Sequence, residues 1–150
     1  QARVKHVVKS LIIETFMGTH NDLVQRLEVV GVADMKKREH RHLFLVMCLH
    51  IADLSNVSKA WDLHVKWSHA ILSEFMSQGD VENKLGMTPI TPHCVRDIRL
   101  GRTNQKNFIH GFVSPLFKLV SDFNPKMSLL SARCQTQMQR NFDRWIELGY

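Results

Sequence analysis

A run of seven apolar residues at positions 43–49, LFLVMCL, most constrains what this chain can fold into. As a helix it is apolar on every side, and such a helix is stable in water only when neighbouring elements surround it. The run is far shorter than the roughly 20 residues that a membrane-spanning helix needs. It therefore predicts the central helix of a globular domain, over about residues 39–54, and no direct insertion into a membrane.

Apolar residues elsewhere in the chain recur at helical spacing, and strict alternation is nearly absent. This period predicts an all-α fold, a compact multi-helix bundle. The first helix carries an apolar face from Val4 to Ile12, and it continues or re-forms as far as Val30. Gly31 is expected to end it.

Glycine and proline divide the rest of the sequence. One helix is expected over about residues 59–78, ended by Gly79 and Asp80, followed by an irregular stretch to residue 104. A helix over about residues 104–122 should bend at Pro115. Asn124 is expected to cap a last helix that begins at Pro125.

Length and composition indicate one globular domain, residues 1–150. Hydrophobic residues make up 44% of the 150 residues and charged residues 23%, which argues against disorder. Cys48, Cys94 and Cys134 lie far apart and include no CxxC pair. Because an odd number of thiols cannot all pair within the chain, a reducing compartment is the simplest interpretation, which predicts a cytoplasmic protein.

The formal net charge of +6 would suit an anionic partner. The basic residues are spread along the sequence, however, and the tightest cluster is Lys36, Lys37, Arg38 and Arg41. Nucleic-acid binders usually interleave basic and aromatic residues on one surface. The cluster therefore indicates a solvated face, and no nucleic-acid partner is predicted. The oligomeric state stays open, with a homodimer as one option.

His50 and Asp53 form the one pair with the spacing of a metal chelate. Residues three apart share a helical face, and aspartate supplies a hard oxygen ligand that suits zinc, magnesium or manganese. Taken alone, the pair is explained more simply by a capping or ion-paired aspartate beside a core histidine, because both residues lie near a helix end.

Ordered motifs surround this pair. HIADLSN at 50–56 is similar to a family motif HCADLSNP, and EFMSQGD at 74–80 to EFFxQGD. GM at 86–87 with ITP at 90–92 is similar to a GM–ISP loop, and NQKNFI at 104–109 to SQxGFI. Together over about 70 residues, these matches resemble the class I 3',5'-cyclic nucleotide phosphodiesterases.

The resemblance extends upstream, where ETFMGTH at 14–20 is similar to the family's ATDMSKH. The family's earlier region, with its HNxxH and HDxxH metal-binding histidines and its catalytic histidine, has no counterpart in this sequence. The resemblance therefore identifies the chain as the C-terminal half of an HD-type phosphodiesterase catalytic domain. No catalytic residue is expected in this segment, and the segment alone is expected to be inactive.

The resemblance implies hydrolysis of cAMP and/or cGMP to 5'-nucleoside monophosphates by a two-metal site of zinc and magnesium, or manganese. Asp53 matches the zinc-ligating aspartate of the family, and His50 would orient Asp53 or a nearby water. Gln105 matches the glutamine that holds the purine, since a carboxamide offers both a donor and an acceptor.

Four further residues belong to the implied substrate site. Phe108 would stack on the base, and Ile71 would close the opposite face of the slot. Asn56 is a candidate for a polar contact with the base, although it could equally cap a helix. Trp67 shares the helical face of Ile71, although tryptophan at such spacing is more often a core residue.

Departures from the family pattern leave a second interpretation open. Phe16 replaces an acidic residue, His64 a tyrosine, and Asn107 a glycine. Since Asp53 and Gln105 are retained, an active enzyme is favoured. The alternative is a non-catalytic helical interaction module or nucleotide-binding module. The sequence leaves the choice between cAMP and cGMP open, because the amide of Gln105 can serve either base.

Overall fold

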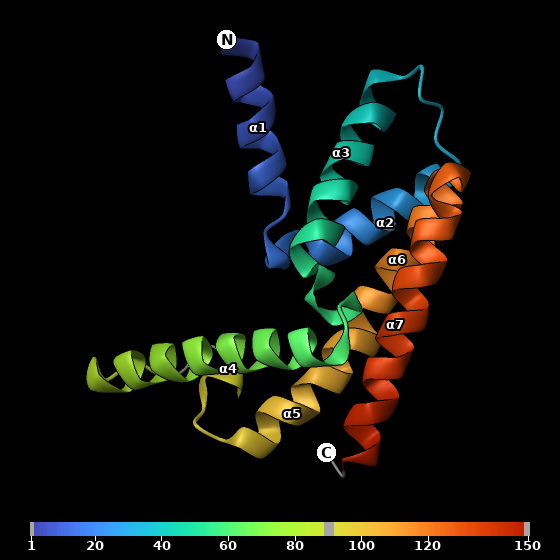
Figure 1. Ribbon diagram of the computed structural model, residues 1–150. Helices are drawn as coiled ribbons and strands as arrows, with labels where there is room; N and C mark the ends of the chain where they lie inside the picture. The colour runs from blue at the N-terminus through green and yellow to red at the C-terminus, as the bar shows by residue number, and fades with distance from the viewer. Residues whose placement is uncertain (1, 89–91, 149–150) are drawn as a thin grey trace. The chain divides into compact units, whose positions relative to one another are not determined.

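The computed structural model describes residues 2–88 and 92–148, and every regular element in those residues is a helix (Figure 1). The predicted all-α fold is thereby confirmed. In chain order the elements are α1 (Ala2–Glu14), η1 (Met17–Thr19), α2 (His20–Val30), α3 (Arg38–Asp53), η2 (Leu54–Ser58), α4 (Trp61–Lys84), η3 (Pro92–Cys94), α5 (Ile98–Asn107), η4 (Phe108–Val113), α6 (Ser114–Phe123), η5 (Pro125–Met127) and α7 (Ser128–Glu147). The element η4 is π-helical, and the other short elements are 3-10 helices.

The chain forms two units, each with its own buried side chains. Within the described ranges, unit 1 takes in the residues up to 55 together with 113–135. Unit 2 takes in residues 56–112 and those from 136 onward. The long helix α7 therefore contributes its first turns to unit 1 and its last turns to unit 2.

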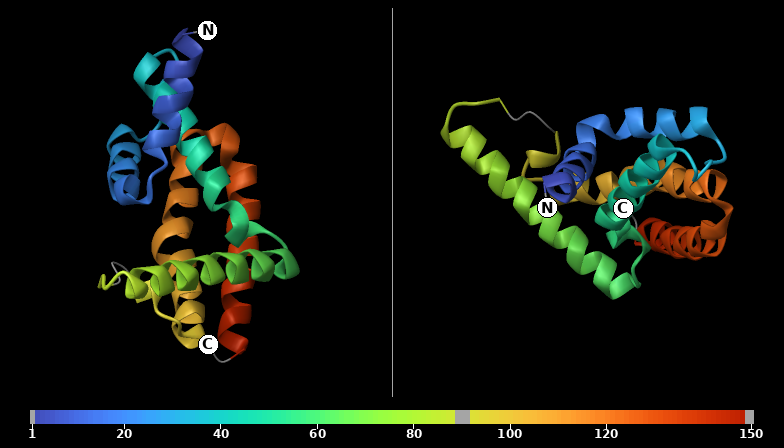
Figure 2. Two further views of the ribbon diagram at one scale, coloured as in Figure 1. Left: turned by 90° about the vertical axis from the view of Figure 1, so that its left-hand side faces the viewer. Right: turned by 90° about the horizontal axis from the view of Figure 1, so that it is seen from above.

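Helix α3 lies at the centre of unit 1, where it contacts α1, α2 and α6, and α2 lies beside α6 (Figures 1 and 2). The buried apolar side chains of these helices recur three or four residues apart, as a helix with one apolar face requires. They are Leu23, Leu27, Leu43, Val46, Met47, Leu116, Phe117, Val120 and Phe123. The prediction that residues 43–49 lie on a central helix is confirmed, but Leu45 and Leu49 remain 46% and 39% exposed.

Among the described residues, no single helix is long and apolar enough to cross a membrane. Within the same described residues, the consecutive segments Arg38–Ser58 and Trp61–Lys84 pass the length and composition test when they are counted together across a bend of 108°.

The first predicted helix breaks and re-forms. Helix α1 ends at Glu14, the 3-10 turn η1 follows, and α2 begins at His20. Gly31 ends α2 as predicted, with a φ of 59° that a residue with a side chain rarely adopts.

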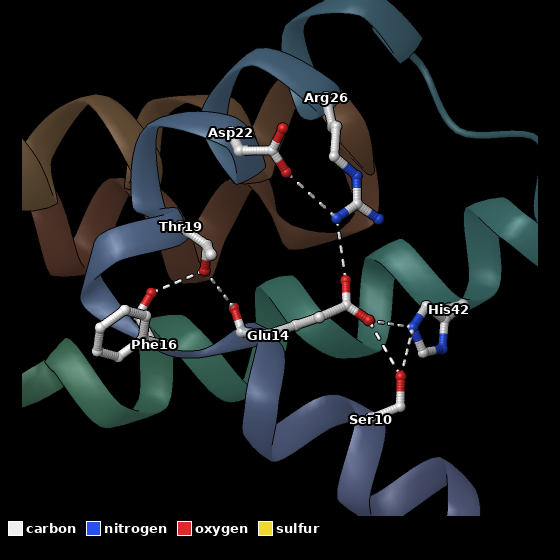
Figure 3. Close-up of polar contacts among 7 residues, drawn as sticks. All are labelled: Ser10, Glu14, Phe16, Thr19, Asp22, Arg26 and His42. Carbon is white, nitrogen blue, oxygen red and sulfur yellow. Dashed lines mark hydrogen bonds and ion pairs between the residues drawn. The ribbon is translucent and has the colours of Figure 1, made fainter.

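Glu14, the last residue of α1, connects α1 to both α2 and α3 (Figure 3). Its Oε1 lies 2.6 Å from Nε2 of His42 on α3, and its Oε2 accepts from Nη1 of Arg26 on α2 at 2.9 Å. Ser10 donates to the same carboxylate at 3.1 Å. Partial burial would raise the pKa of Glu14, but these three contacts outweigh it and lower the pKa below its usual value. The ionised carboxylate therefore fixes the end of α1 and the point from which the turn at Phe16 begins.

Helix α4 is longer than predicted. The prediction that Gly79 ends it is wrong, because α4 continues to Lys84 and is followed by Gly86, whose φ is 69°. Gly79 is buried, and a Cβ there would overlap the carbonyl oxygen of Cys94 in η3, which packs against α4. Gly79 is therefore needed for close packing with a distant segment and not for ending the helix.

The stretch expected to be irregular, residues 79–104, is largely helical. It holds the last turns of α4, the short element η3 and the start of α5. Ile90 and Thr91, which belong to the loop similar to GM–ISP, lie outside the described residues.

The helix predicted over residues 104–122 is divided. Helix α5 ends at Asn107, the π-helical η4 follows, and α6 begins at Ser114. The prediction that Pro115 bends a continuous helix is wrong, because Pro115 lies in the first turn of α6. A residue without an N–H group is tolerated there, since the first amides of a helix have no intrahelical acceptor.

The start of the last helix agrees with the prediction. The side chain of Asn124 accepts a hydrogen bond from the backbone N–H of Lys126 at 3.2 Å, and Pro125 follows the cap. The first turn is the 3-10 element η5, after which α7 runs to Glu147.

The apolar residues of α7 are only partly buried. Met138 and Trp145 are buried, whereas Leu130 is 49% exposed. The polar residue Asn141 is buried in unit 2, where its amide donates to the carbonyls of Val57 at 2.8 Å and of Lys59 at 2.9 Å. These bonds hold the segment before α4 against α7.

We expect Gly79→Ala to lower the free energy of unfolding by about 1–3 kcal/mol, because the added methyl group must displace the backbone at Cys94. Gly111→Ala is the matched control, since a Cβ at Gly111 meets no atom within 4 Å. The shift in the midpoint of urea unfolding checks both variants. Equal midpoints for the two variants would show that the close approach at Gly79 is not a packing constraint.

Candidate functional site

Asp53 is the last residue of α3, and its side chain is exposed. Among the described residues, it makes no hydrogen bond and no ion pair. Its carboxylate is therefore available to a ligand.

His50 lies one turn before Asp53 and is fully buried. Its Nε2 lies 3.0 Å from Nδ1 of His20, the first residue of α2, which is also buried. Burial, and after it the neighbouring His20, lower the pKa of His50, whereas the Asp53 carboxylate acts in the opposite direction. His50 is therefore neutral at pH 7 and belongs to a buried histidine pair that fixes α2 against α3.

The contact between His20 and His50 was not predicted. The sequence did contain a signal, because His20 is the last residue of the ETFMGTH segment that resembles a family motif. In the same segment, Phe16 is 69% exposed, and its ring lies over Gly18, where a Cβ would be 3.0 Å or less from it. The ring thus occupies the turn between α1 and η1.

No group of three or more histidine, cysteine, aspartate or glutamate side chains is placed to hold a metal ion within the described part of the chain. Within the described residues, Asp53 therefore has a carboxylate that could act as a single ligand of a cation. This is a hard ligand of the type that zinc and magnesium accept.

Gln105 lies on α5 in unit 2 and is half-buried. Its Oε1 is placed 3.2 Å from the hydroxyl oxygen of Ser68 on α4. The same hydroxyl lies 2.9 Å from the backbone carbonyl oxygen of His64, one turn earlier on α4. Ser68 was not among the predicted site residues, because its role becomes visible only once α4 and α5 are packed together.

The other predicted substrate residues also lie in unit 2. Phe108, directly after α5, is half-buried and stacks with Phe112, with ring centroids 6.2 Å apart. On α4, Ile71 is half-buried and Trp67 is 52% exposed. Trp67 is therefore not the core residue that its spacing alone would favour.

Asn56 lies in η2, at the start of unit 2. Its Oδ1 is buried, and no described residue donates a hydrogen bond to it. A buried amide oxygen without a donor costs free energy unless a water or ligand satisfies it. This distinguishes Asn56 from a simple helix cap.

His64 connects α4 to the end of α7 inside unit 2. It is fully buried, and its Nε2 accepts a hydrogen bond from Nε1 of Trp145 at 2.9 Å. Trp61 packs edge-on against Trp145 at 5.1 Å, and the guanidinium of Arg144 lies 4.9 Å from the Trp61 ring centroid. Desolvation lowers the pKa of His64 to about 4, and a backbone interaction with Asn56 opposes it only in part. His64 is therefore a neutral acceptor at pH 7.

The structure thus brings together Gln105, Ser68 and His64 in unit 2, while Asp53 and His50 belong to unit 1. Residues 1–134 match the sequence model of a protein family that is described as 3'5'-cyclic nucleotide phosphodiesterase. The chain belongs to this family. The match confirms the resemblance seen in the motifs. Members of this family are metal-dependent phosphodiesterases.

Curated relatives in this family are about one-third identical to the chain. A mouse (Mus musculus) dual specificity calcium/calmodulin-dependent 3',5'-cyclic nucleotide phosphodiesterase 1C is 34% identical over 121 residues, which cover 79% of this chain and 17% of the relative. A cGMP-specific 3',5'-cGMP phosphodiesterase 3 from Dictyostelium discoideum is 32% identical, over 80% of this chain and 26% of the relative. The chain thus spans about a quarter or less of these relatives.

Solved phosphodiesterase domains share the fold. The phosphodiesterase domain of Salpingoeca rosetta rhodopsin phosphodiesterase superposes with a TM-score of 0.87 at 24% identity. The match covers 98% of this chain and 45% of that domain's chain. That domain therefore contains the same succession of helices as this chain.

The low pKa of His64 predicts a loss of stability in acid. The pKa in the folded state, about 4, lies below the ordinary value of 6.5, so the unfolded chain binds the proton first as the pH falls. The contribution to the free energy of unfolding is complete above pH 6.5. It declines between pH 6.5 and pH 4, by at most about 3 kcal/mol.

Urea unfolding across this pH range checks the prediction, with His64→Phe as the variant that cannot titrate. The variant should lose less stability between pH 6.5 and pH 4 than the original chain. The same decline in both proteins would contradict a buried neutral His64.

Proposed function

We propose that the protein containing this chain hydrolyses 3',5'-cyclic nucleotides, cAMP and/or cGMP, to 5'-nucleoside monophosphates. Membership of the phosphodiesterase family carries this proposal, together with one observation on the residues. Asp53, within the segment HIADLSN, presents an exposed carboxylate that no described side chain engages. The proposal includes a cytoplasmic location.

We propose Asp53 as a ligand of a divalent cation, zinc or magnesium, with manganese as a substitute. When bound, such ions neutralise charge on the phosphate and activate water. The neutral state of His50 supports the assignment, since an imidazolium one turn away would repel a cation. In place of a direct contact with Asp53, the buried pair of His50 and His20 would keep the end of α3 in position.

The remaining ligands and the acid that protonates the leaving oxygen would come from outside this chain. Asp53 is a single donor, and no larger group of metal-binding side chains lies among the described residues. The 150-residue segment alone is therefore proposed to be inactive.

For the purine, we propose Gln105 as the residue that forms hydrogen bonds with the base edge. Phe108 would stack on one face of the base and Ile71 would contact the other. Asn56 would use its unpartnered Oδ1 to accept from the base, which would satisfy a buried atom. Trp67 is exposed enough to line the same site.

Asp53→Ala in the full-length enzyme should lower kcat at least 100-fold and reduce the metal content, because a charged ligand is lost. The circular dichroism spectrum should not change, since the Asp53 side chain is exposed. Asp122→Ala is the control, an exposed aspartate on α6 in the same unit. Unchanged turnover in Asp53→Ala would remove this residue from the metal site.

Gln105→Ala should raise KM for cyclic nucleotides about tenfold or more, because the polar edge of the bound base loses its partners. The metal content should stay the same. Gln139→Ala is the control, since Gln139 is exposed and, among the described residues, its amide donates to Asp143 on its own helix. Unchanged KM for both cAMP and cGMP would reject the assigned role of Gln105.

A further inference from the structure

The segment that joins α2 to α3, residues 31–37, runs along the outer edge of unit 1 (Figures 1 and 2). Val32 and Met35 in this segment are apolar, yet they are 69% and 38% exposed to solvent. A single exposed apolar side chain is ordinary on a protein surface. Two of them beside a cluster of basic residues are a feature of surfaces that contact a partner.

The basic cluster at the start of α3 consists of Lys36, Lys37, Arg38 and Arg41. Arg41 turns back onto the segment, where its Nη1 donates to the carbonyl oxygen of Met35 at 2.9 Å. Lys36, Lys37 and Arg38 are exposed, and within the described residues none of them forms an ion pair. Because the N-terminal end of a helix carries partial positive charge, these three charges do not stabilise α3. They are available to an anionic partner.

Hydrogen bonds hold the backbone of this segment in place. The N–H of Ala33 donates to the carbonyl oxygen of Phe123 at the end of α6, at 2.8 Å. The side chain of Asp34 accepts from the N–H of Lys36 at 3.0 Å, and the N–H of Asp34 donates to Nδ1 of His40 at 3.0 Å. Because the backbone is already ordered, the exposed side chains can contact a partner at a small cost in conformational entropy.

Charge and apolar exposure together indicate the kind of partner. Residues 32–41 carry four basic side chains against the two acidic ones of Asp34 and Glu39, so the surface attracts anions. Nucleic acid would match the charge, but its binding usually uses aromatic side chains that stack on the bases, and residues 32–38 contain none. An anionic bilayer matches both features, because its headgroups carry phosphate and carboxylate groups and its acyl chains accept apolar side chains.

We propose that residues 32–38 form a docking surface for the anionic lipid headgroups of a membrane. Val32 and Met35 enter the headgroup region, and the basic residues 36–38 lie among the lipid phosphates. The contact is peripheral and reversible, since two apolar side chains and three charges bind far more weakly than a spanning helix. The surface is separate from the proposed roles of Asp53 and Gln105, so docking and hydrolysis can be tested independently.

The test measures co-sedimentation of the full-length protein with vesicles of phosphatidylcholine mixed with phosphatidylserine, and with vesicles of phosphatidylcholine alone. The original protein should bind the anionic vesicles more tightly, and added salt should weaken this binding. The basic variant combines Lys36→Gln, Lys37→Gln and Arg38→Gln. Its affinity for the anionic vesicles should fall about 100-fold, because each basic residue near such a surface contributes about fivefold.

Two further variants separate the apolar contribution from general electrostatic attraction. The apolar variant combines Val32→Ser and Met35→Gln, and its affinity should fall about tenfold, since buried apolar groups are lost from the headgroup region. The control variant combines Lys5→Gln, Lys118→Gln and Arg133→Gln, three exposed basic residues of unit 1 outside the segment. It should keep most of the affinity, because charges held away from the bilayer are screened.

The proposal is overturned if the original protein binds both kinds of vesicle equally, or if the basic variant binds as well as the control variant. Equal affinity of the original protein and the apolar variant also overturns it, and would indicate a face for an acidic protein or nucleic acid. Thermal unfolding checks that every variant is folded. Hydrolysis of cyclic nucleotides in solution should be the same in all of them. Absence of hydrolysis in the original protein would contradict the proposed function and leave the docking result standing.

Discussion

Burial of one face of α3 determines where the chemically important residues of unit 1 are placed. Val46, Met47 and His50 share the face that packs against the neighbouring helices, and all three are fully buried. The buried histidine pairs its Nε2 with Nδ1 of His20 on α2 and stays neutral. One turn later, Asp53 ends the helix on the exposed side. The same packing that stabilises the unit thus presents a carboxylate to solvent and keeps positive charge away from it.

In unit 2, a series of polar contacts places the candidate residue Gln105. The ring of His64 accepts a hydrogen bond from Trp145 of α7. The backbone carbonyl of His64 contacts the hydroxyl of Ser68, and the same hydroxyl contacts the amide of Gln105 on α5. Three helices are therefore connected through two residues on one face of α4. Because these groups are buried, an unsatisfied member would be costly, and the orientation of each is determined by its neighbours.

Local signals in the sequence predicted those elements that depend on local interactions. Gly31 and Asn124 end and begin helices as expected, since a positive φ and a side-chain cap involve only adjacent residues. The predictions for Gly79 and Pro115 were wrong, because segments that local sequence signals do not show determine the roles of these residues. Gly79 accommodates the backbone of Cys94, and Pro115 follows a π-helical segment that periodicity did not indicate. The candidate residues Asp53 and Gln105 came from family motifs, whereas their partners His20 and Ser68 required the packed helices.

The neutral state of His64 matters for the contact between α4 and α7. Desolvation keeps the His64 ring uncharged, so that its Nε2 can accept from Trp145. A protonated ring would have no acceptor to offer, and the Trp145 N–H would lose its partner in a buried place. The backbone carbonyl of the same residue lies 2.9 Å from the Ser68 hydroxyl, so one turn of α4 carries both contacts. Acid is therefore expected to weaken the attachment of α4 to α7, where the hydrogen bond between Trp145 and His64 lies.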